Sequence, residues 1–140
     1  MSKVFWDTNP YIYLFDGASP FNQSARDLRK RMIERRDELL TSTMTLGEVQ
    51  AGPRRAGNPV VAQQLRDAIR QTSRILPFDE AAADLYAELR QNPAIKPPDA
   101  IQLACAAVAG VELFITNDAA LHKLTVRGIH FICSMQRAPI

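Results

Sequence analysis

The 140-residue sequence has no apolar stretch as long as the roughly 18 uncharged residues that a membrane-spanning helix needs. Its first segment reaches Asp7 before any apolar run of the kind that a signal peptide contains, so we interpret it as part of the fold. Internal repeats, low-complexity tracts and linkers are also absent. These absences predict a cytoplasmic protein that forms one domain over residues 1–140 and has no membrane partner.

Cysteine and histidine are scarce, with two residues of each type. Cys105 and Cys133 lie in apolar segments, and neither stands at the short spacing from His122 or His130 that nucleates a zinc site. We therefore expect two buried free thiols in a reducing compartment and no zinc centre.

The net charge of +2 is too small to indicate a nucleic-acid partner by itself. Basic residues are nevertheless clustered, because one segment and one adjacent pair hold many of them: Arg26, Arg29, Lys30, Arg31, Arg35 and Arg36, and Arg54-Arg55, which we place in a turn. Such runs are usually solvated helix faces, so they are only weak support for a polyanionic partner.

Short apolar segments alternate with amphipathic segments along the whole chain. The apolar segments predict five strands, at Val4–Trp6, Leu39–Met44, Ile75–Phe78, Leu113–Ile115 and Ile129–Ile132. The third of these contains a proline, which cannot donate to a ladder, and is therefore expected at an edge of the sheet.

Helical periodicity fills the segments between these strands. Apolar residues at intervals of three and four predict a helix from Phe21 to Met32 and another through Val61 and Ile69. A third helix is predicted to begin at Pro97-Pro98 and to end at Gly110. Strands that alternate with helices of this length predict an α/β fold, a three-layer α/β/α arrangement around a mainly parallel sheet of about five strands.

Four acidic residues lie where such a fold places its ligand site, in the crevice at the carboxyl ends of the strands. Asp7 directly follows the first strand, and Asp118 lies shortly after the fourth. Glu48 lies a few residues beyond the second strand, in what we predict to be the first turn of a helix. Asp99 is in the first turn of the helix before the fourth strand, and this helix start could lie at either end of the sheet.

Each acid also has a structural explanation. Asp7 can form an Asx-turn, Glu48 can complete a capping box with Thr45, Asp99 can interact with a helix dipole, and Asp118 can cap a helix. No single acid therefore indicates a functional site. The four acids together do indicate one, because like charges about 4 Å apart repel by roughly 4 kcal/mol at an effective dielectric constant near 20. Converging carboxylates need a neutralising cation, and an all-oxygen set fits Mg²⁺ or Mn²⁺.

The sequence around these acids resembles the PIN domain, and in particular the VapC-type toxins of toxin–antitoxin pairs. The resemblance rests on four short motifs in the family's order and spacing over nearly the whole chain: Phe5-Trp6-Asp7-Thr8-Asn9, Ser42-Thr43-Met44-Thr45-Leu46-Gly47-Glu48-Val49, Pro97-Pro98-Asp99-Ala100-Ile101-Gln102-Leu103-Ala104 and Leu113-Phe114-Ile115-Thr116-Asn117-Asp118. One departure is that Ala119–His122 follows the last acid, where the family often has an aromatic residue.

The resemblance implies a PIN-like fold and an endoribonuclease that depends on Mg²⁺ or Mn²⁺. It also implies RNA as the substrate, a cognate antitoxin as the partner and a homodimer. By motif, the acidic quartet of the family corresponds to Asp7, Glu48, Asp99 and Asp118, with Asp7 and Asp99 as the core metal ligands. Thr116 matches a hydroxyl residue of the family that supports a metal ligand or a water. Thr8 and Asn117 are candidates for residues that contact the metal ligands and not the metal itself.

Further residues are candidates for contacts with RNA or with a partner. Arg54 and Arg55 can hold substrate phosphates or can simply be solvated. His122 can reach RNA, although a surface or half-buried histidine is the simpler interpretation. The segment Pro10–Phe15 can form a groove for an antitoxin helix or a turn of a core helix.

Two other functions remain as alternatives. Phosphoryl transfer through an aspartyl phosphate at Asp7 is disfavoured, because Asn9 replaces the second acid that such enzymes commonly have two positions later. A non-catalytic PIN-like module that binds RNA or protein is disfavoured for a different reason, since a scaffold has no need of a mutually repulsive set of acids.

Overall fold

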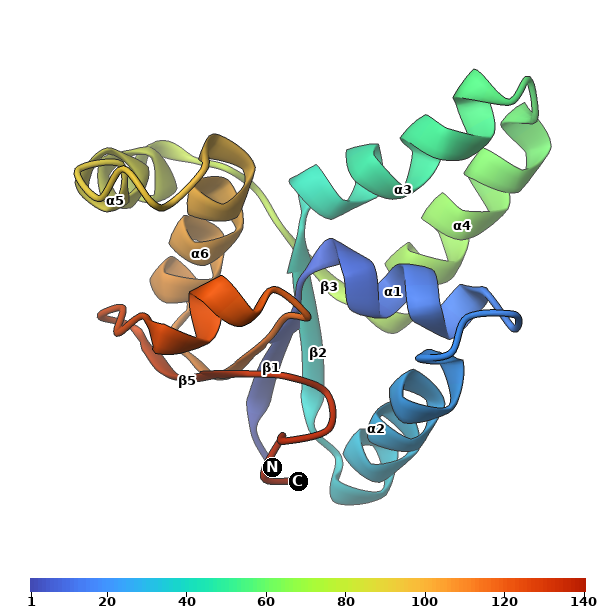
Figure 1. The fold of residues 1–140 in the computed structure, drawn as a ribbon, viewed down its shortest axis with the longest axis horizontal. Coiled ribbons are helices and arrows are strands. Elements are labelled where there is room, and N and C mark those ends of the chain that lie inside the picture. Colours follow the sequence, from blue (N-terminus) through green and yellow to red (C-terminus); the bar gives the residue numbers. More distant parts are fainter.

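The computed structural model describes residues 1–140 and contains one five-stranded sheet in which all strands are parallel (Figure 1). The strand order is β3-β2-β1-β4-β5. The strands are β1 (Lys3–Trp6), β2 (Glu38–Ser42), β3 (Arg74–Leu76), β4 (Val111–Ile115) and β5 (Ile129–Cys133). The predicted α/β fold and parallel sheet are confirmed, and the strand before Pro77 lies at an edge as predicted.

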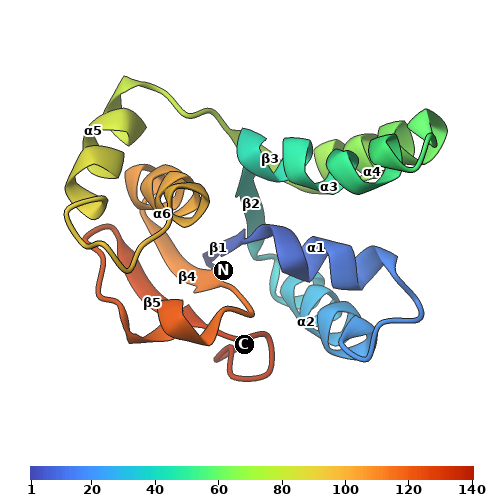
Figure 2. The ribbon, with the colours of Figure 1, turned by 45° about the horizontal axis from the view of Figure 1, so that its top comes forward.

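Six α-helices and one short 3₁₀ helix connect these strands. They are α1 (Thr8–Phe15), α2 (Asn22–Arg35), α3 (Thr43–Arg55), α4 (Pro59–Thr72), α5 (Glu80–Leu89), α6 (Pro97–Ala109) and the 3₁₀ helix η1 (Ala119–Lys123). Figure 2 shows α5 and α6 on one side of the strands and α1 with α2 on the other. None of the helices combines the length and the apolar character that crossing a membrane requires.

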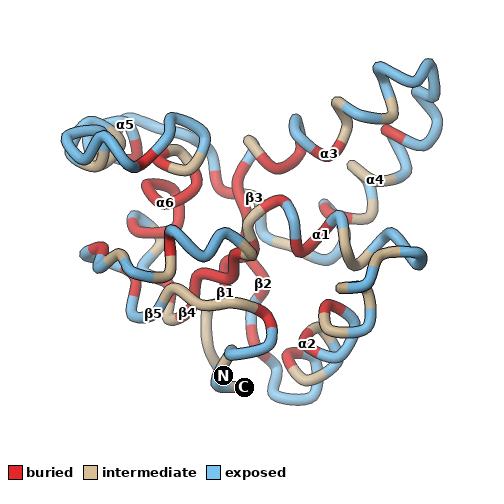
Figure 3. Tube along the Cα trace, in the orientation of Figure 1, coloured by how far each residue is buried: buried red, intermediate tan, exposed pale blue.

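Alternating residues of the strands fill a separate hydrophobic core on each face of the sheet. Phe5 and Phe114, from neighbouring strands, stack with ring centroids 5.0 Å apart and pack toward α5 and α6. Val4 and Trp6 point to the opposite face, where they pack with α1, α2 and the start of α3. This two-sided burial follows from the side-chain period of two along a strand. In Figure 3 the buried residues accordingly run along the strands and the inner faces of the helices.

The order of the strands creates a switch point beside β1. The chain leaves β1 toward β2 on one side, and β4 later inserts on the other side. Connections diverge at such a point, which leaves a crevice at the carboxyl ends of the strands. The backbone N–H of Asp7 donates to the Ile115 carbonyl oxygen at 2.9 Å, so the residue after β1 is held directly beside the end of β4.

Two local predictions for α3 are wrong. The helix begins at Thr43 and its N-cap is Ser42, whose hydroxyl accepts from the Met44 N–H at 3.1 Å, so Thr45 and Glu48 form no capping box. Glu48 is therefore in the second turn of α3. Arg54 and Arg55 lie in the last helical turn and not in a loop, because α3 continues past its breaker residues while it packs against α4.

The two cysteines are free thiols, as predicted. Cys105 is buried against α5 and Cys133 is half-buried. Burial raises the pKa of the Cys105 thiol to about 11 and also raises that of Cys133. Neither thiol lies in the crevice described next.

Candidate functional site: a carboxylate crevice at the switch point

Asp7 is the N-cap of α1, and its carboxylate is held in one orientation. One oxygen, Oδ1, accepts from the Thr8 backbone N–H at 2.8 Å and from the Gln102 amide at 3.3 Å. The other oxygen, Oδ2, accepts from the Thr116 hydroxyl at 2.9 Å. The three donors come from α1, from α6 and from the segment after β4, and they hold this side chain in place without any ligand.

The pKa of Asp7 is raised above its ordinary value. Burial is the largest cause, and the nearby charge of Glu48 adds to it. The hydrogen bonds from Thr8, Thr116 and Gln102 act in the opposite direction, because they stabilise the charged form. Asp7 is thus an acid for which the folded protein provides hydrogen bonds but no positive charge.

Asp99 lies at the same end of the sheet as the other acids. Its pKa is raised first by burial and then by the charges of Asp7, Asp118 and Glu48, which only the charge of Lys96 opposes. Asp7, Glu48 and Asp99 line one common cavity, so these three carboxylates meet at this end of the sheet. The start of α6, which the sequence left open between two ends, therefore faces the crevice.

A cavity of about 250 Å³ lies among these residues, and only one of the side chains that line it is hydrophobic. The lining residues are Asp7, Thr8, Asn9, Ile12, Glu48, Pro98, Asp99 and Gln102. We call this cavity the crevice. Three of the four predicted acids line it, whereas Asp118 does not.

Glu48 and Asp118 are more exposed than Asp7 and are held differently. The Thr8 hydroxyl donates to Glu48 Oε1 at 2.6 Å, which links α1 to α3 across the crevice. Asp118 caps η1 by accepting from the Ala120 N–H at 3.0 Å, so its structural explanation is correct. Its own backbone N–H donates to the Thr116 hydroxyl at 3.1 Å, and Thr116 therefore connects Asp118 to Asp7.

Sequence reasoning missed a set of buried polar residues beneath the crevice. Gln102 is 1% exposed and contacts the hydroxyls of Ser42, Thr45 and Thr8 as well as Asp7. One signal was available, because Gln102 is the only polar residue in the apolar run from Ala100 to Ala109 and lies three residues after Asp99. That spacing places it on the same helix face as Asp99, one turn deeper.

The donor set of the crevice fits a hard divalent cation. All of its titratable lining residues are carboxylates, and neither histidine nor cysteine is among them. No group of three or more acidic, histidine or cysteine side chains is arranged so that it could hold a metal ion. Mg²⁺ commonly binds through one or two carboxylates and completes its shell with waters and substrate phosphates, and this crevice offers such an arrangement.

The remaining candidates do not line the crevice. The Arg54 guanidinium is held by the Gln50 side chain at 2.9 Å. His122 is half-buried, with its Nε2 2.9 Å from the Thr116 carbonyl oxygen. The Asn117 amide donates to the Tyr13 hydroxyl at 3.1 Å and so joins α1 to the segment after β4.

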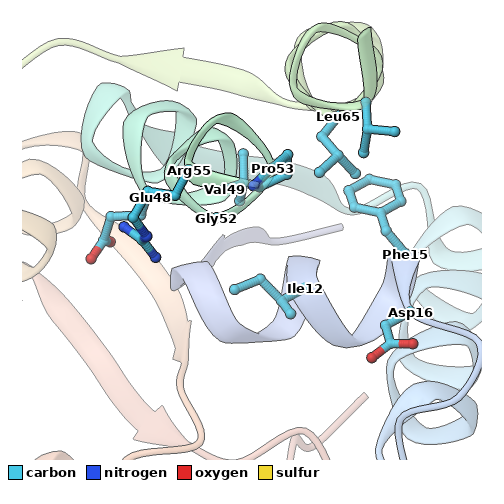
Figure 4. A pocket seen from close by; sticks show the side chains of 10 residues that line it. Ile12, Phe15, Asp16, Glu48, Val49, Gly52, Pro53, Arg55 and Leu65 are labelled. Atoms are coloured by element: carbon cyan, nitrogen blue, oxygen red, sulfur yellow. The ribbon is translucent and has the colours of Figure 1, made fainter. Parts of the chain in front are cut away.

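A second, apolar depression adjoins the crevice, with a volume of about 420 Å³. We call it the α1–α4 groove, and it is lined by Ile12, Phe15, Asp16, Glu48, Val49, Gly52, Pro53, Arg55, Val61 and Leu65. Figure 4 shows Glu48 and Arg55 at one end of it and Phe15 and Leu65 at the other. Ile12 and Glu48 belong to both cavities.

Solved structures with the same fold come from toxin–antitoxin systems. A chain in the DNA-bound VapBC structure from Salmonella typhimurium matches with a TM-score of 0.75 and 20% identity over 96% of this chain and 99% of its own length. A chain in a toxin–antitoxin complex from Klebsiella pneumoniae matches with a TM-score of 0.65 and 28% identity, over 90% of this chain and 94% of its own length. A toxin from Mycobacterium tuberculosis, described as cleaving the sarcin–ricin loop, matches with a TM-score of 0.66 and 18% identity, over 87% of this chain and 96% of its own length.

A search of curated protein sequences gives no match. The PIN domain model, in contrast, matches residues 4–126, which include β1 from its second residue, all of β2, β3 and β4, and all four acids, but not β5. This match agrees with the fold, with the switch-point crevice and with the structural neighbours. The chain is therefore a member of the PIN domain family.

Proposed function

We propose that this protein is a metal-dependent endoribonuclease that hydrolyses RNA phosphodiester bonds, and that it is the toxin of a toxin–antitoxin pair. The observation that carries the proposal is that Asp7, Glu48 and Asp99 line one cavity without a basic lining residue, with Asp118 linked to Asp7 through the Thr116 hydroxyl. A scaffold gains nothing from the mutual repulsion of these carboxylates, whereas a cation site needs several of them close together. The M. tuberculosis neighbour, described as a cleaving toxin, supports the same class of reaction.

Asp7 and Asp99 are proposed as the principal ligands of Mg²⁺ or Mn²⁺, with Glu48 and Asp118 completing the acidic site. The ion, when bound, lowers the pKa of a water and offsets the charge of the scissile phosphate. Thr116 and Thr8 keep the carboxylates of Asp7 and Glu48 in place through the hydrogen bonds described above.

The exposed position of Glu48 suits it to accept the proton of the attacking water. Its side chain is tied only through the Thr8 hydroxyl, whereas Asp7 is held by three donors. Arg55 lies near Glu48 at the end of the α1–α4 groove and is proposed, with Arg54, to contact RNA phosphates.

The α1–α4 groove is proposed as the docking site of the antitoxin. Exposed Ile12 and Phe15, from the segment Pro10–Phe15, line the groove, whereas Pro10 and Tyr11 of the same segment are buried. An amphipathic helix can place its apolar face in such a groove. The Salmonella and Klebsiella neighbours come from complexes described as VapBC and as toxin–antitoxin, which supports a cognate partner here. A homodimer in the cytoplasm remains part of the proposal.

Cleavage of RNA by the purified protein tests the reaction. We expect cleavage with Mg²⁺, none after addition of EDTA, and a severe loss in Asp7→Asn, which removes the charge of the most strongly oriented carboxylate. Asp84→Asn is the matched control, because Asp84 is exposed on α5. Full activity in EDTA, or unimpaired cleavage by Asp7→Asn, would contradict the mechanism.

Expression in a bacterial host tests the biological role. We expect growth arrest by the wild-type chain, relief by co-expression of the protein encoded immediately upstream, and no arrest by Asp7→Asn. If the pure, metal-loaded protein cleaves no RNA, a binding module becomes the better interpretation.

A further inference from the structure

The amide of Gln102 lies beneath the crevice and has a single orientation dictated by its neighbours. The Ser42 hydroxyl donates to Gln102 Oε1, and Ser42 also caps α3 by accepting from the Met44 N–H. Since the Oε1 side is fixed in this way, the two N–H groups must point the opposite way. They point toward Thr45 Oγ1 at 2.8 Å, Thr8 Oγ1 at 3.2 Å and Asp7 Oδ1 at 3.3 Å.

Gln102 also determines how the Thr8 hydroxyl is used. A hydroxyl has one hydrogen, and a neighbouring N–H group can only donate to its oxygen. When Gln102 donates to Thr8, the hydrogen of Thr8 is left for Glu48 Oε1, 2.6 Å away. One amide thus orients the Asp7 carboxylate directly and the Glu48 carboxylate through Thr8.

Burial gives this arrangement its rigidity. Gln102 is 1% exposed, Thr8 is 7% exposed, and Ser42 and Thr45 are fully buried. Water therefore does not compete for these hydrogen bonds, and each group has few alternative partners. The amide comes from α6, whereas its partners belong to β2, α3, α1 and the end of β1, so it joins the elements that supply Asp7, Glu48 and Asp99.

We propose that Gln102 is a positioning residue that sets the Asp7 and Glu48 carboxylates for the divalent cation and for the reaction. It does not itself bind the ion or RNA, because its N–H groups are used within the protein. The inference rests on the proposed nuclease function. It adds to the four acids a residue whose hydrogen bonds orient two of them, Asp7 and Glu48.

The test replaces Gln102 with Leu, which has a similar size but no donor or acceptor. We expect kcat for RNA cleavage to fall about 10- to 100-fold, as it does when groups that orient metal ligands are removed, with KM for RNA within about twofold of wild type. Calorimetric titration with Mn²⁺, in the absence of RNA, should show a Kd that rises about 10-fold or more.

Two controls separate positioning from general loss of stability. Gln64→Leu makes the same change at an exposed position on α4 and should keep wild-type kcat and Mn²⁺ affinity. Ile69→Val removes one methyl group from the hydrophobic core that contains Val4 and Trp6, and it should lower Tm without lowering kcat. If Ile69→Val, at an equal Tm, loses as much activity as Gln102→Leu, the positioning role is wrong.

A double-mutant cycle with Thr8→Val tests the proposed route to Glu48. Because Gln102 acts on Glu48 through Thr8, the double variant should lose clearly less kcat than the product of the two single losses. Losses that simply multiply would overturn this route. Wild-type kcat and Mn²⁺ affinity in Gln102→Leu would overturn the proposal entirely.

The Mn²⁺ titration also distinguishes this inference from the proposed function. A wild-type chain that binds Mn²⁺ but cleaves no RNA contradicts the nuclease, and the comparison of Mn²⁺ affinities then still decides the role of Gln102. A wild-type chain that neither cleaves RNA nor binds Mn²⁺ overturns both.

Discussion

The crevice and the α1–α4 groove are adjacent and built by opposite means. The crevice has one hydrophobic lining residue and is shaped by hydrogen bonds among strand ends and helix starts. Half of the ten residues that line the groove are hydrophobic, Phe15 and Leu65 among them. The difference supports our proposal that the crevice holds a cation and that the groove holds an apolar partner segment. They meet at Glu48 and Ile12, so a partner in the groove reaches the edge of the crevice.

The strongest of the four effects is expected for loss of the Thr116 hydroxyl, which should weaken RNA cleavage at the crevice and leave binding in the groove unchanged. Thr116→Val removes the donor to Asp7 Oδ2 and the acceptor of the Asp118 N–H, whereas Thr116 is not among the residues that line the groove. We expect RNA cleavage to fall about 10- to 100-fold while antitoxin affinity stays unchanged. Thr125→Val, which makes the same change at an exposed position, is the control and should keep wild-type cleavage. An equal loss of antitoxin binding would show that the two cavities are not independent.

Truncation of Phe15 should have the converse effect. Phe15 is 37% exposed and lines the groove, so Phe15→Ala removes an aromatic anchor from the proposed interface. We expect the Kd for the antitoxin to rise about 30-fold, which corresponds to roughly 2 kcal/mol, with little change in kcat. Phe131→Ala, at an exposed position on β5, should leave this Kd unaltered. Unaltered binding by Phe15→Ala would place the partner elsewhere.

Arg55 lies where the two cavities meet, and its replacement should have a smaller effect on both. Its side chain is exposed, so solvent screens its interactions. Arg55→Gln should raise KM for RNA about two- to fivefold at low salt, and less at high salt. Arg127→Gln, an exposed arginine before β5, provides the comparison. A loss that does not depend on salt would argue against phosphate contact.

The smallest expected effect concerns stability without metal. The pKa of Asp99 in the folded protein is raised, so its contribution to stability is fully present below its unfolded pKa and is lost as pH rises through the folded pKa. At pH 7 the charged group therefore lowers stability, and Asp99→Asn should raise Tm by a few degrees. This advantage should shrink as pH falls through the raised pKa, and also when Mg²⁺ is added to the wild type. A lower Tm for Asp99→Asn in metal-free buffer at pH 7 would contradict the repulsion.

Local patterns predicted most of the fold. Apolar runs located all five strands, because this signal depends on neighbouring residues alone, although β2 ends at Ser42 and not at Met44. The edge position of β3 was also correct, but the strand ends at Leu76 and Pro77 follows it. The helix stop at Gly110 was also correct, since that residue adopts φ 68°, which glycine tolerates best. The Thr45–Glu48 capping box failed because Ser42, at the junction of β2 and α3, takes the N-cap position.

The alternation of strands and helices and the placement of Asp7 and Asp118 at strand ends could be predicted from the amino-acid sequence, since both follow from residues close along the chain. The end of the sheet that Asp99 occupies could not be predicted, because a long connection precedes α6. Packing in three dimensions also fixes the partners of Gln102, which are 57 to 95 residues away in the chain. Contacts of that range depend on how helices pack across the sheet, and no local pattern encodes them.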